Sequence, residues 1–304
     1  MNYKNTLENI FQIVKSQENS GQLADYIPEL SKVDPEKFGV GFLAKNEEVI
    51  GIGDCDTKFS IQSISKVLAL SLAYGLIGEK IWERVGIEPS GNPFNSLMQL
   101  ETDLGKPRNP FINAGALVIC DMLLSNLKDP QNDFLDYVRQ FSSIQDLNFT
   151  RAIAESEKKT GFRNRALCNF IKSLGNIENK PEDVLNFYFN MSSIEMTCKQ
   201  LAKTFSLFAS CNYRTSEGNQ MLDLIHIKRI NAIMQTCGFY DESGEFAFKV
   251  GLPGKSGVGG GIVAVHPELY SIAVWSPKLN EKGNSYRGMK LLEMFTTKTK
   301  LSIF

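Results

Sequence analysis

Segments with the composition of β-strands occur near the two ends of the chain and hardly at all between them. Two early apolar runs flank a polar turn at residues 45–48 and predict a hairpin, and three late runs joined by turn residues predict further strands. The expected strands are residues 38–43, 49–52, 246–252, 257–265 and 270–275. We therefore expect one antiparallel sheet to which both ends of the chain contribute.

The middle of the chain, residues 76–235, is dominated by amphipathic patterns that are typical of helices. The clearest of these stretches are residues 113–124, 134–141, 163–174 and 198–208. Elsewhere, the spacing of apolar residues predicts a first helix over residues 4–19, a buried helix from Ser63 to Gly75, and a last helix after Asn284.

The order of these elements defines the expected fold class, which is α/β (α+β). Residues 1–75 and 236–304 would build the antiparallel sheet and its flanking helices, and residues 76–235 would form an inserted all-helical lobe. We expect the two parts to work as a single catalytic unit, because a cleft between two such parts is the usual place for a small-molecule site.

Charge and length restrict the partners of the chain. Its 304 residues are 42% hydrophobic and carry 33 basic and 34 acidic side chains, so the formal net charge is -1. This balance provides no field that would attract nucleic acid or an anionic membrane. The first residues lack an apolar signal core, and no stretch approaches 18 uncharged apolar residues, so we expect a cytoplasmic protein with a small-molecule substrate.

The few histidines and the scattered cysteines argue against a metal centre. His226 lies in a helical pattern and His266 precedes Pro267 at an expected turn, and neither has a second ligand at metal-binding spacing. The six cysteines form no Cys-x-x-Cys pair, and we interpret them as reduced packing residues. We expect no metal and no cofactor, and the shortage of histidine also weakens any Ser-His-Asp triad.

A candidate nucleophile opens the helix that follows the early hairpin. Ser63 and Lys66 are three residues apart, so a helix would place the amine beside the hydroxyl. Burial in the apolar helix would lower the pKa of the Lys66 ammonium and make it a base. Ser-x-x-Lys is a weak motif, and the alternative is that Ser63 caps the helix and Lys66 is a solvated residue of its first turn.

A second signal lies in the late strands. Lys255-Ser256-Gly257 leads into the glycine-rich run Val258-Gly259-Gly260-Gly261, which places a cation, a hydroxyl and bare backbone along one edge. The alternative is a glycine-rich hairpin with a surface lysine. Taken together, the two signals resemble the serine β-lactamase and penicillin-binding protein superfamily. The chain departs from that superfamily because it lacks a Ser-Asp-Asn segment, and its one Tyr-x-Asn candidate, Tyr188-Phe189-Asn190, lies in a helical pattern.

A closer resemblance, covering nearly the whole chain, is to the glutaminase family, which shares the β-lactamase/DD-peptidase-like fold. The segments that carry the resemblance are Asp25-Tyr26-Ile27-Pro28, Ser63-Ile64-Ser65-Lys66, Lys106-Pro107-Arg108-Asn109-Pro110-Phe111-Ile112-Asn113-Ala114-Gly115-Ala116, Ser156-Glu157, Gly161-Phe162-Arg163-Asn164, Asn186-Phe187-Tyr188-Phe189, Cys237-Gly238-Phe239-Tyr240-Asp241 and Gly251-Leu252-Pro253-Gly254-Lys255-Ser256-Gly257-Val258.

This resemblance implies an enzyme that hydrolyses L-glutamine to L-glutamate and ammonia, assembled as a homodimer or homotetramer. It makes Ser63 the nucleophile, Lys66 its base and Tyr240 a proton donor to the departing ammonia. The residues in the family's substrate-contact positions are Tyr26, Ser63, Asn113, Glu157, Asn164, Tyr188, Tyr240 and Val258, the last through its backbone.

These identities suit a free amino acid. An anion such as Glu157 would hold the substrate ammonium, neutral donors such as Asn164 would hold the carboxylate, and the backbone N–H groups of Ser63 and Val258 would hold the oxyanion. Two other functions remain open at this point. One is another acyl-serine hydrolase of the same fold, such as a β-lactamase, an esterase or a peptidase, and the other is a non-catalytic amino-acid sensor.

Overall fold

The computed structural model describes residues 2–91, 97–142, 144–209 and 222–304. Its main feature is a five-stranded sheet in the order β2-β1-β7-β6-β5, in which every neighbouring pair is antiparallel. The strands are β1 (Gly39–Ala44), β2 (Ile50–Gly53), β5 (Gly254–Gly257), β6 (Gly261–His266) and β7 (Tyr270–Trp275). A two-stranded pair, β3 (Phe59–Ser60) with β4 (Glu195–Met196), lies outside this sheet.

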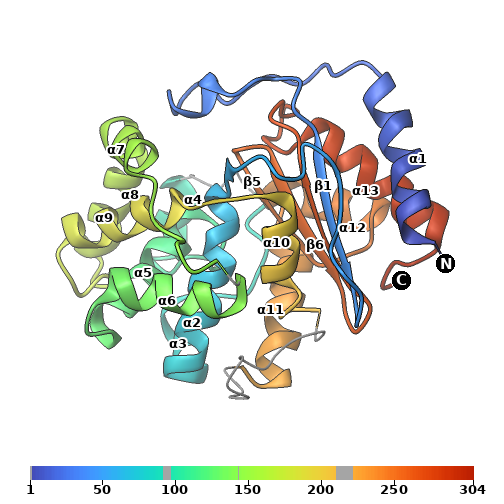
Figure 1. Ribbon diagram of the computed structural model, residues 1–304. Coiled ribbons are helices and arrows are strands. Elements are labelled where there is room, and N and C mark those ends of the chain that lie inside the picture. The colour runs from blue at the N-terminus through green and yellow to red at the C-terminus, as the bar shows by residue number, and fades with distance from the viewer. Residues whose placement is uncertain (1, 92–96, 143, 210–221) are drawn as a thin grey trace.

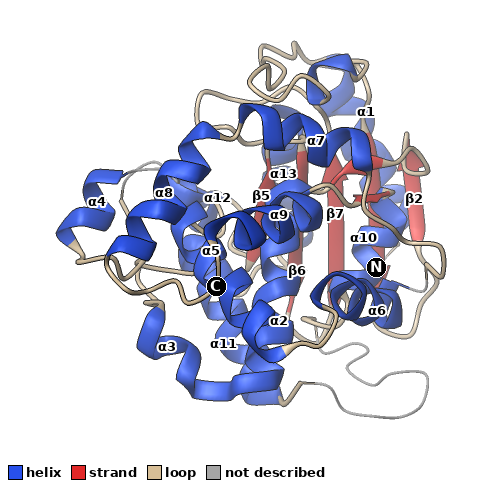
Figure 2. Cartoon of the chain, turned by 90° about the vertical axis from the view of Figure 1, so that its left-hand side faces the viewer, coloured by secondary structure: helices blue, strands red, loops and turns tan. Residues whose placement is uncertain are grey.

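Helices surround the sheet and fill the middle of the chain (Figure 1). The described α-helices are α1 (Tyr3–Ser16), α2 (Ser65–Ile77), α3 (Ile81–Arg84), α4 (Leu97–Thr102), α5 (Asn113–Asn126), α6 (Pro130–Ser142), α7 (Arg151–Thr160), α8 (Phe162–Ser173), α9 (Pro181–Ser192), α10 (Cys198–Phe205), α11 (Leu224–Cys237), α12 (Ser243–Lys249) and α13 (Tyr286–Thr299). Figure 2 looks onto the helical side, with α5 and α9 in front of the strands.

The sheet is buried on both faces because successive side chains point to opposite sides. On β6, Ile262 and Ala264 pack in one core with α1 and α13, whereas Val263 and Val265 belong to a second core that continues into the central helices. Every residue of α2 from Ser65 to Tyr74 is buried, and the apolar ones among them belong to the second core. Helix α2 therefore runs through the interior, which is what places its first turn next to the sheet.

The antiparallel sheet built from both ends of the chain confirms the expected fold class, and the early hairpin, β7 and the last helix confirm the sequence predictions. The expected strand at 257–265 is found as β6, with β5 beginning earlier, at Gly254. Helix α2 continues past Gly75 and ends at Ile77, followed by the cap residue Gly78, which has a φ of 58°. The division into two lobes at 75/76 and 235/236 stays a prediction.

One predicted strand is wrong. Residues 246–252 contain no strand, and α12 covers their first half. In the sequence, Phe246, Phe248 and Val250 follow the alternation of a strand. In the structure Phe246 and Val250 are buried while Phe248 is 89% exposed, which is the i, i+4 spacing of a helix and not the alternation of a strand. Phe246 stacks on Phe239, with 3.6 Å between ring centroids, so the local pattern is decided by packing against the end of α11.

Among the residues that the structure describes, no helix is both long and apolar enough to cross a bilayer.

Gly41 on β1 provides a test of the packing between sheet and helices. A Cβ atom at this position would lie 2.2 Å from the carbonyl oxygen of Cys198, the first residue of α10. We expect Gly41→Ala to destabilise the protein by about 1–3 kcal/mol, because α10 must move away from the sheet. Denaturant unfolding checks this, with Gly244→Ala in α12 as the control, since a Cβ there meets nothing within 4 Å. An unchanged midpoint for Gly41→Ala would contradict the close approach.

Candidate active site

The candidate nucleophile lies in a short turn between the small sheet and α2. Strand β3 is fixed by pairing with β4, and Ile61 continues this pairing by donating from its N–H to Ile194. A single 3-10 turn, Gln62–Ile64, then carries Ser63 to the start of α2. Gln62 has a φ of 49°, which is strained for a residue with a side chain. The chain therefore accepts backbone strain immediately before the residue predicted to react.

Ser63 does not cap a helix. The N-cap of α2 is Ile64, and no side-chain cap hydrogen bond is made there. The Ser63 hydroxyl instead forms a hydrogen bond with the phenol of Tyr240. The alternative of a capping serine is therefore wrong, and the hydroxyl points into the protein.

Lys66 is one helical turn after Ser63 and is buried, with 1% of its surface exposed. Its Nζ donates to Oδ1 of Asn113 at 2.6 Å and to the carbonyl oxygen of Phe111 at 3.2 Å. Burial lowers the pKa of the Lys66 ammonium to about 7, although the negative charge of Glu157 acts in the opposite direction. Such an amine is largely available as a base near neutral pH, which a solvated lysine is not.

Lys255 on β5 is equally buried, so the alternative of a surface lysine is wrong. Its Nζ donates to the carbonyl oxygens of Gly238 at 3.0 Å and Ser256 at 2.7 Å. Burial, and after it the positive charge of Lys66, lowers the pKa of the Lys255 ammonium well below its usual value. Two lysines that influence each other in this way lie in one low-dielectric region.

Tyr240 is where these groups meet. Nζ of Lys255 lies 4.1 Å from the centroid of the Tyr240 ring, and Nζ of Lys66 lies 5.7 Å from it. Burial raises the pKa of the Tyr240 phenol, while the hydrogen bond with Ser63 acts in the opposite direction. Tyr240 also has a φ of 55°, a second strained position in the site. The side chains of Ser63, Lys66 and Lys255 thus converge on one phenol.

A cavity of about 340 Å³ contains several of the predicted substrate contacts. Its lining residues are Tyr26, Ile27, Asn113, Glu157, Thr160, Gly161, Arg163 and Asn164. Nδ2 of Asn113 donates to Oδ1 of Asn164 at 2.9 Å, so the amide that holds Lys66 also forms part of the cavity wall. This shared residue connects the cavity to the buried base.

Glu157 is a buried carboxylate in this cavity, with 6% of its surface exposed. Burial raises its pKa to about 7, although a hydrogen bond from Gln62 and the positive charge of Lys66 act in the opposite direction. The bond runs from Nε2 of Gln62 to Oε1 of Glu157 and is 2.9 Å long. None of the ion pairs found among the described residues involves Glu157, so a cationic ligand group would supply its missing partner.

Tyr188 and Val258 lie outside the lining of this cavity but beside the same groups. The ring of Tyr188 on α9 has its centroid 5.8 Å from Nζ of Lys66. Val258 follows β5, where a Cβ on the neighbouring Gly257 would lie 2.5 Å from the carbonyl oxygen of Ile61. A Cβ on Gly259 would lie 2.3 Å from the carbonyl oxygen of Ser60. Glycine on both sides of Val258 therefore lets this backbone approach the turn that carries Ser63.

Two residues of the site were missed at the sequence level. Gln62 precedes Ser63 and holds Glu157, and Arg163 lines the cavity beside Asn164. Arg163 lies inside a segment that carried the family resemblance and Gln62 immediately precedes another, so adjacency to Asn164 and Ser63 was the available signal. A buried amide and an exposed guanidinium have no periodic pattern of their own, and their roles depend on the neighbours that folding provides.

The described residues contain no group of three or more His, Cys, Asp or Glu side chains that could hold a metal ion. Five cysteines among them, Cys55, Cys120, Cys168, Cys198 and Cys237, are free and buried, whereas Cys211 lies outside the described residues.

Comparison with known proteins identifies the family. The family model described as Glutaminase matches residues 21–304. The chain belongs to the glutaminase family. A curated glutaminase from Christiangramia forsetii is 52% identical over 304 residues, covering 100% of both chains. The solved structure of the probable glutaminase ybaS is 32% identical, with a TM-score of 0.93, and the match covers 99% of this chain and 98% of that one.

A further solved glutaminase is described with a bound small molecule. It is the probable glutaminase from Bacillus subtilis complexed with 6-diazo-5-oxo-L-norleucine, which is 30% identical to this chain. The TM-score is 0.88, and the match covers 100% of this chain and 97% of that one. The family resemblance predicted from the sequence motifs is confirmed by these matches, and with it the expected glutaminase fold.

Proposed function

We propose that this chain hydrolyses L-glutamine to L-glutamate and ammonia through an acyl-enzyme on Ser63, with Lys66 as the general base. Family membership makes the chain a glutamine amidohydrolase, and the assignment of individual residues to steps is the proposal. The observation that carries it is the convergence of Ser63, Lys66 and Lys255 on Tyr240, beside a cavity with a buried carboxylate.

In the acylation step, the Ser63 oxygen bonds to the side-chain amide carbon of glutamine while its proton passes to the neutral amine of Lys66. The oxyanion that forms would be held by the backbone N–H groups of Ser63 and Val258. The bond from carbon to nitrogen then breaks. Tyr240 donates its phenolic proton to the departing nitrogen and recovers a proton from Lys66, so that ammonia leaves and the amine is neutral again.

Deacylation repeats this sequence with water. Lys66 accepts a proton from the attacking water, the ester bond to Ser63 breaks, and the serine oxygen regains its proton as glutamate leaves. Burial raises the pKa of Tyr240, so the phenol carries its proton at neutral pH and this proton is present when the nitrogen departs. Because burial lowers the pKa of Lys66, the amine is ready to accept.

The substrate cavity suits the ends of a free amino acid. Glu157 would pair with the α-ammonium, and Asn164, Tyr188 and the guanidinium of Arg163 would face the α-carboxylate. The Bacillus subtilis relative binds 6-diazo-5-oxo-L-norleucine, whose name describes an α-amino acid with a carbonyl at position 5, where the side chain of glutamine has its amide carbon. A β-lactam has no ammonium to pair with a buried carboxylate, which disfavours the alternative of a β-lactamase.

The decisive experiment mixes purified protein with L-glutamine and measures ammonia and glutamate together. We expect the two products in equal amounts, with D-glutamine and ester substrates turned over far more slowly. If glutamine binds to folded protein and neither product forms, the chain is an amino-acid sensor. If an ester or a β-lactam is the better substrate, it is another acyl-serine hydrolase.

The pH dependence of kcat/KM should reflect the shifted pKa values of Lys66 and Glu157. Both Lys66 and Glu157 must be deprotonated for the proposed reaction, and the pKa of each is about 7. We expect kcat/KM to rise with pH through about 7, and to fall below it by more than tenfold per pH unit, because the two deprotonated fractions multiply. Initial rates at low glutamine concentration between about pH 5 and 9 measure this. A flat profile would contradict a neutral Lys66 as the base.

Removing the charge of Glu157 should weaken substrate binding. We expect Glu157→Gln to raise KM by roughly 10- to 100-fold, with a smaller effect on kcat, because the pairing with the α-ammonium is present before and during the reaction. The acid limb should also become shallower and move to lower pH, since Glu157 raises the pKa of Lys66. Steady-state kinetics checks this, with Glu155→Gln on the same helix as the control, as Glu155 is exposed and paired with Arg151. Equal KM values for the two variants would contradict the pairing.

Assembly and location remain predictions. We propose a homodimer or homotetramer in the cytoplasm, and light scattering at several protein concentrations tests the assembly. The division of the chain into a sheet part and an inserted helical lobe is likewise a proposal, to be tested by hydrogen exchange in the two parts.

A further inference from the structure

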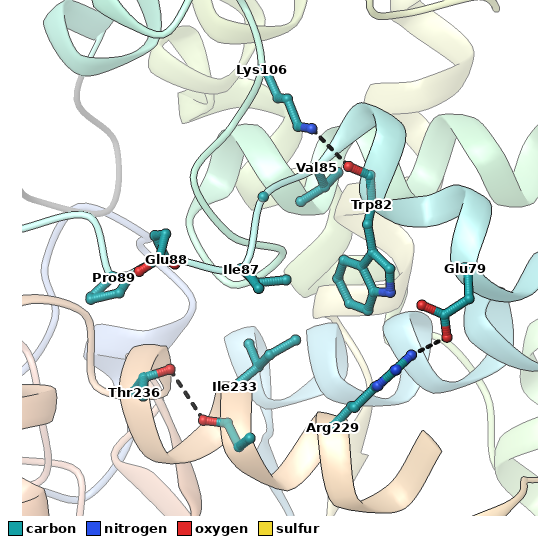
Figure 3. Close-up of a pocket in the computed structure, with 12 residues that line it drawn as sticks. Glu79, Trp82, Val85, Ile87, Glu88, Pro89, Lys106, Arg229, Ile233 and Thr236 are labelled. Carbon is teal, nitrogen blue, oxygen red and sulfur yellow. Dashed lines mark hydrogen bonds and ion pairs between the residues drawn. The ribbon is translucent and has the colours of Figure 1, made fainter. Parts of the chain in front are cut away.

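A second cavity, of about 640 Å³, lies on a different part of the chain. It is formed by Glu79 in the 3-10 turn Gly78–Lys80 that follows α2, by α3 and the segment after it, by Lys106 and by one side of α11 (Figure 3). Its lining residues are Glu79, Trp82, Val85, Gly86, Ile87, Glu88, Pro89, Lys106, Arg229, Ala232, Ile233 and Thr236, and none of them lines the substrate cavity. The volume is within the range of small-molecule sites.

Most of the cavity wall is apolar. The side chains of Trp82, Ile87 and Ile233 face one another across it (Figure 3). The Trp82 ring is held in place by an edge-to-face contact with Tyr74, with 5.3 Å between centroids. Ile87 is 54% exposed, so this cavity leaves a large aliphatic side chain uncovered. A ligand with an apolar body would cover it and would gain contact with an aromatic face.

The charges at the cavity are of two kinds. Arg229 and Glu79 form an ion pair with each other, and Arg229 also donates to the phenol of Tyr74, so these groups are satisfied within the protein. Lys106 and Glu88 are in none of the ion pairs between described residues, although the negative charge of Glu88 contributes to a raised pKa of the Arg108 guanidinium. Nζ of Lys106 donates to the carbonyl oxygen of Trp82, at 2.7 Å. A cation and an anion therefore remain for ligand groups of opposite sign.

We propose that this cavity is a second ligand site that binds a free α-amino acid with a large apolar side chain. The ligand carboxylate pairs with Lys106, the ligand ammonium pairs with Glu88, and the side chain packs against Trp82 and Ile233. A zwitterion matches a pair of opposite charges, whereas a simple anion would be attracted by Lys106 and repelled by Glu88.

The cavity wall is connected to the proposed base by a short series of hydrogen bonds. The N–H of Glu88 donates to the carbonyl of Arg108 at 2.9 Å, and Nδ2 of Asn109 donates to the carbonyl of Glu88 at 2.9 Å. Oδ1 of Asn109 accepts from the N–H of Phe111 at 3.0 Å. The carbonyl of Phe111 in turn accepts from Lys66. A ligand that moves Glu88 therefore acts on the segment that positions Lys66.

A second wall of the cavity, helix α11, is directly followed in the chain by residues that contact Lys255 and Lys66. Helix α11 contributes Arg229, Ala232, Ile233 and Thr236 to the cavity and ends at Cys237. The next residue, Gly238, accepts the hydrogen bond from Lys255, and Tyr240 follows two residues later. We infer that occupancy of the cavity changes kcat. This coupling rests on the proposed function of Lys66 and Tyr240, whereas the binding site itself does not.

Trp82 provides the binding measurement. The chain has two tryptophans, and the other, Trp275, is 1% exposed and stacked on Phe59. We expect L-phenylalanine to change the tryptophan fluorescence saturably, in the presence of enough L-glutamate to fill the substrate cavity. We expect Trp82→Phe to abolish this change.

Two further probes test the roles of the two charges in binding. 3-Phenylpropionate lacks the ammonium and 2-phenylethylamine lacks the carboxylate, and each should bind at least tenfold more weakly. Glu88→Gln should weaken the binding of phenylalanine but not the binding of 3-phenylpropionate.

Ala232→Phe tests the location. Ala232 is an exposed helical residue that lines the cavity, so a phenyl group there fills the site without entering the core. Ala166→Phe is the matched control, because Ala166 is exposed on α8. We expect Ala232→Phe, and not the control, to abolish phenylalanine binding. We also expect phenylalanine to change kcat for glutamine at least twofold in the wild-type protein and the control, and to leave Ala232→Phe unaffected.

Each outcome decides one part of the proposal. Absence of a saturable signal with phenylalanine, or binding that survives Ala232→Phe, overturns the site. Stronger binding of 3-phenylpropionate than of phenylalanine overturns the amino-acid class. Binding without any change in kcat overturns the coupling. A wild-type protein that releases no ammonia from glutamine refutes the proposed function instead, and the fluorescence titration still decides the site.

Discussion

Ser63→Ala is expected to lower kcat for glutamine by roughly 10⁴- to 10⁶-fold, the range seen when an activated serine nucleophile is removed. The hydroxyl is the group that forms the acyl bond, and no other hydroxyl takes its place beside Lys66 in the proposed mechanism. The variant should fold, because Ser63 forms no cap and its side chain bonds only to Tyr240 among the interactions described above. Coupled measurement of glutamate formation gives the rate.

Binding separates the loss of chemistry from the loss of the site. Glutamine should still bind to Ser63→Ala, because Glu157 and Asn164 remain, and calorimetry can measure this without turnover. Ser65→Ala is the control within the same turn: its hydroxyl donates to the carbonyl of Gln62 and has no part in the proposed reaction. We expect the control to keep activity within about tenfold of the wild type. Substantial activity in Ser63→Ala would require another nucleophile.

Much of the fold could be predicted because local patterns and packing agree. The alternation along β6 and β7 and the helical spacing of α1 and α13 correspond to what these elements bury. The pattern was ambiguous only where two periods coincide, as at Phe246 and Val250, which fit both a strand and a helix. There the choice is made by the contact with Phe239, which is a tertiary interaction.

The candidate site was predictable to the extent that its residues are close in sequence. Ser63 and Lys66 are one helical turn apart, so a helix alone places them together. The approach of Lys255 depends on β5 lying against the 3-10 turn, which the glycines at 257 and 259 permit. No local sequence pattern predicts that β5 and this turn come into contact. The sequence motifs named Lys255 through family resemblance, and only the fold explains why its charge matters.

The second cavity shows the limit of the same reasoning. Its walls come from the turn and helix at residues 79–82, the segment at residues 85–89, Lys106 and α11, and these parts are spread over more than half of the chain. Each of these segments, taken alone, is an ordinary helix end or loop with a few charges. Arg229 and Glu79 form an ion pair, whereas Lys106 and Glu88 are in none of the ion pairs between described residues, and this difference depends on the fold. A site defined by what remains unpaired has no sequence signature.

Lys66→Met is the second change with a large expected effect. Methionine has nearly the shape of the lysine side chain and suits the buried, apolar surroundings of α2. The base is lost, so we expect kcat to fall by about 10²- to 10⁴-fold, the usual contribution of general base catalysis. The substrate cavity is unchanged except that Asn113 loses the donor to its Oδ1. KM should therefore change less than kcat.

The pH profile of this variant distinguishes a base from a charge. If Lys66 acts as a neutral amine, its removal eliminates one of the two deprotonations, and the residual activity falls by no more than tenfold per pH unit below about pH 7. If Lys66 acts as a cation that stabilises the oxyanion, wild-type activity must instead decrease as the pH rises through about 7. The charge of Lys66 also contributes to the lowered pKa of the neighbouring Lys255 ammonium. A neutral Lys66 thus removes one of two positive charges from a buried pair, and that is the electrostatic reason why the amine, and not the ammonium, should be the working form.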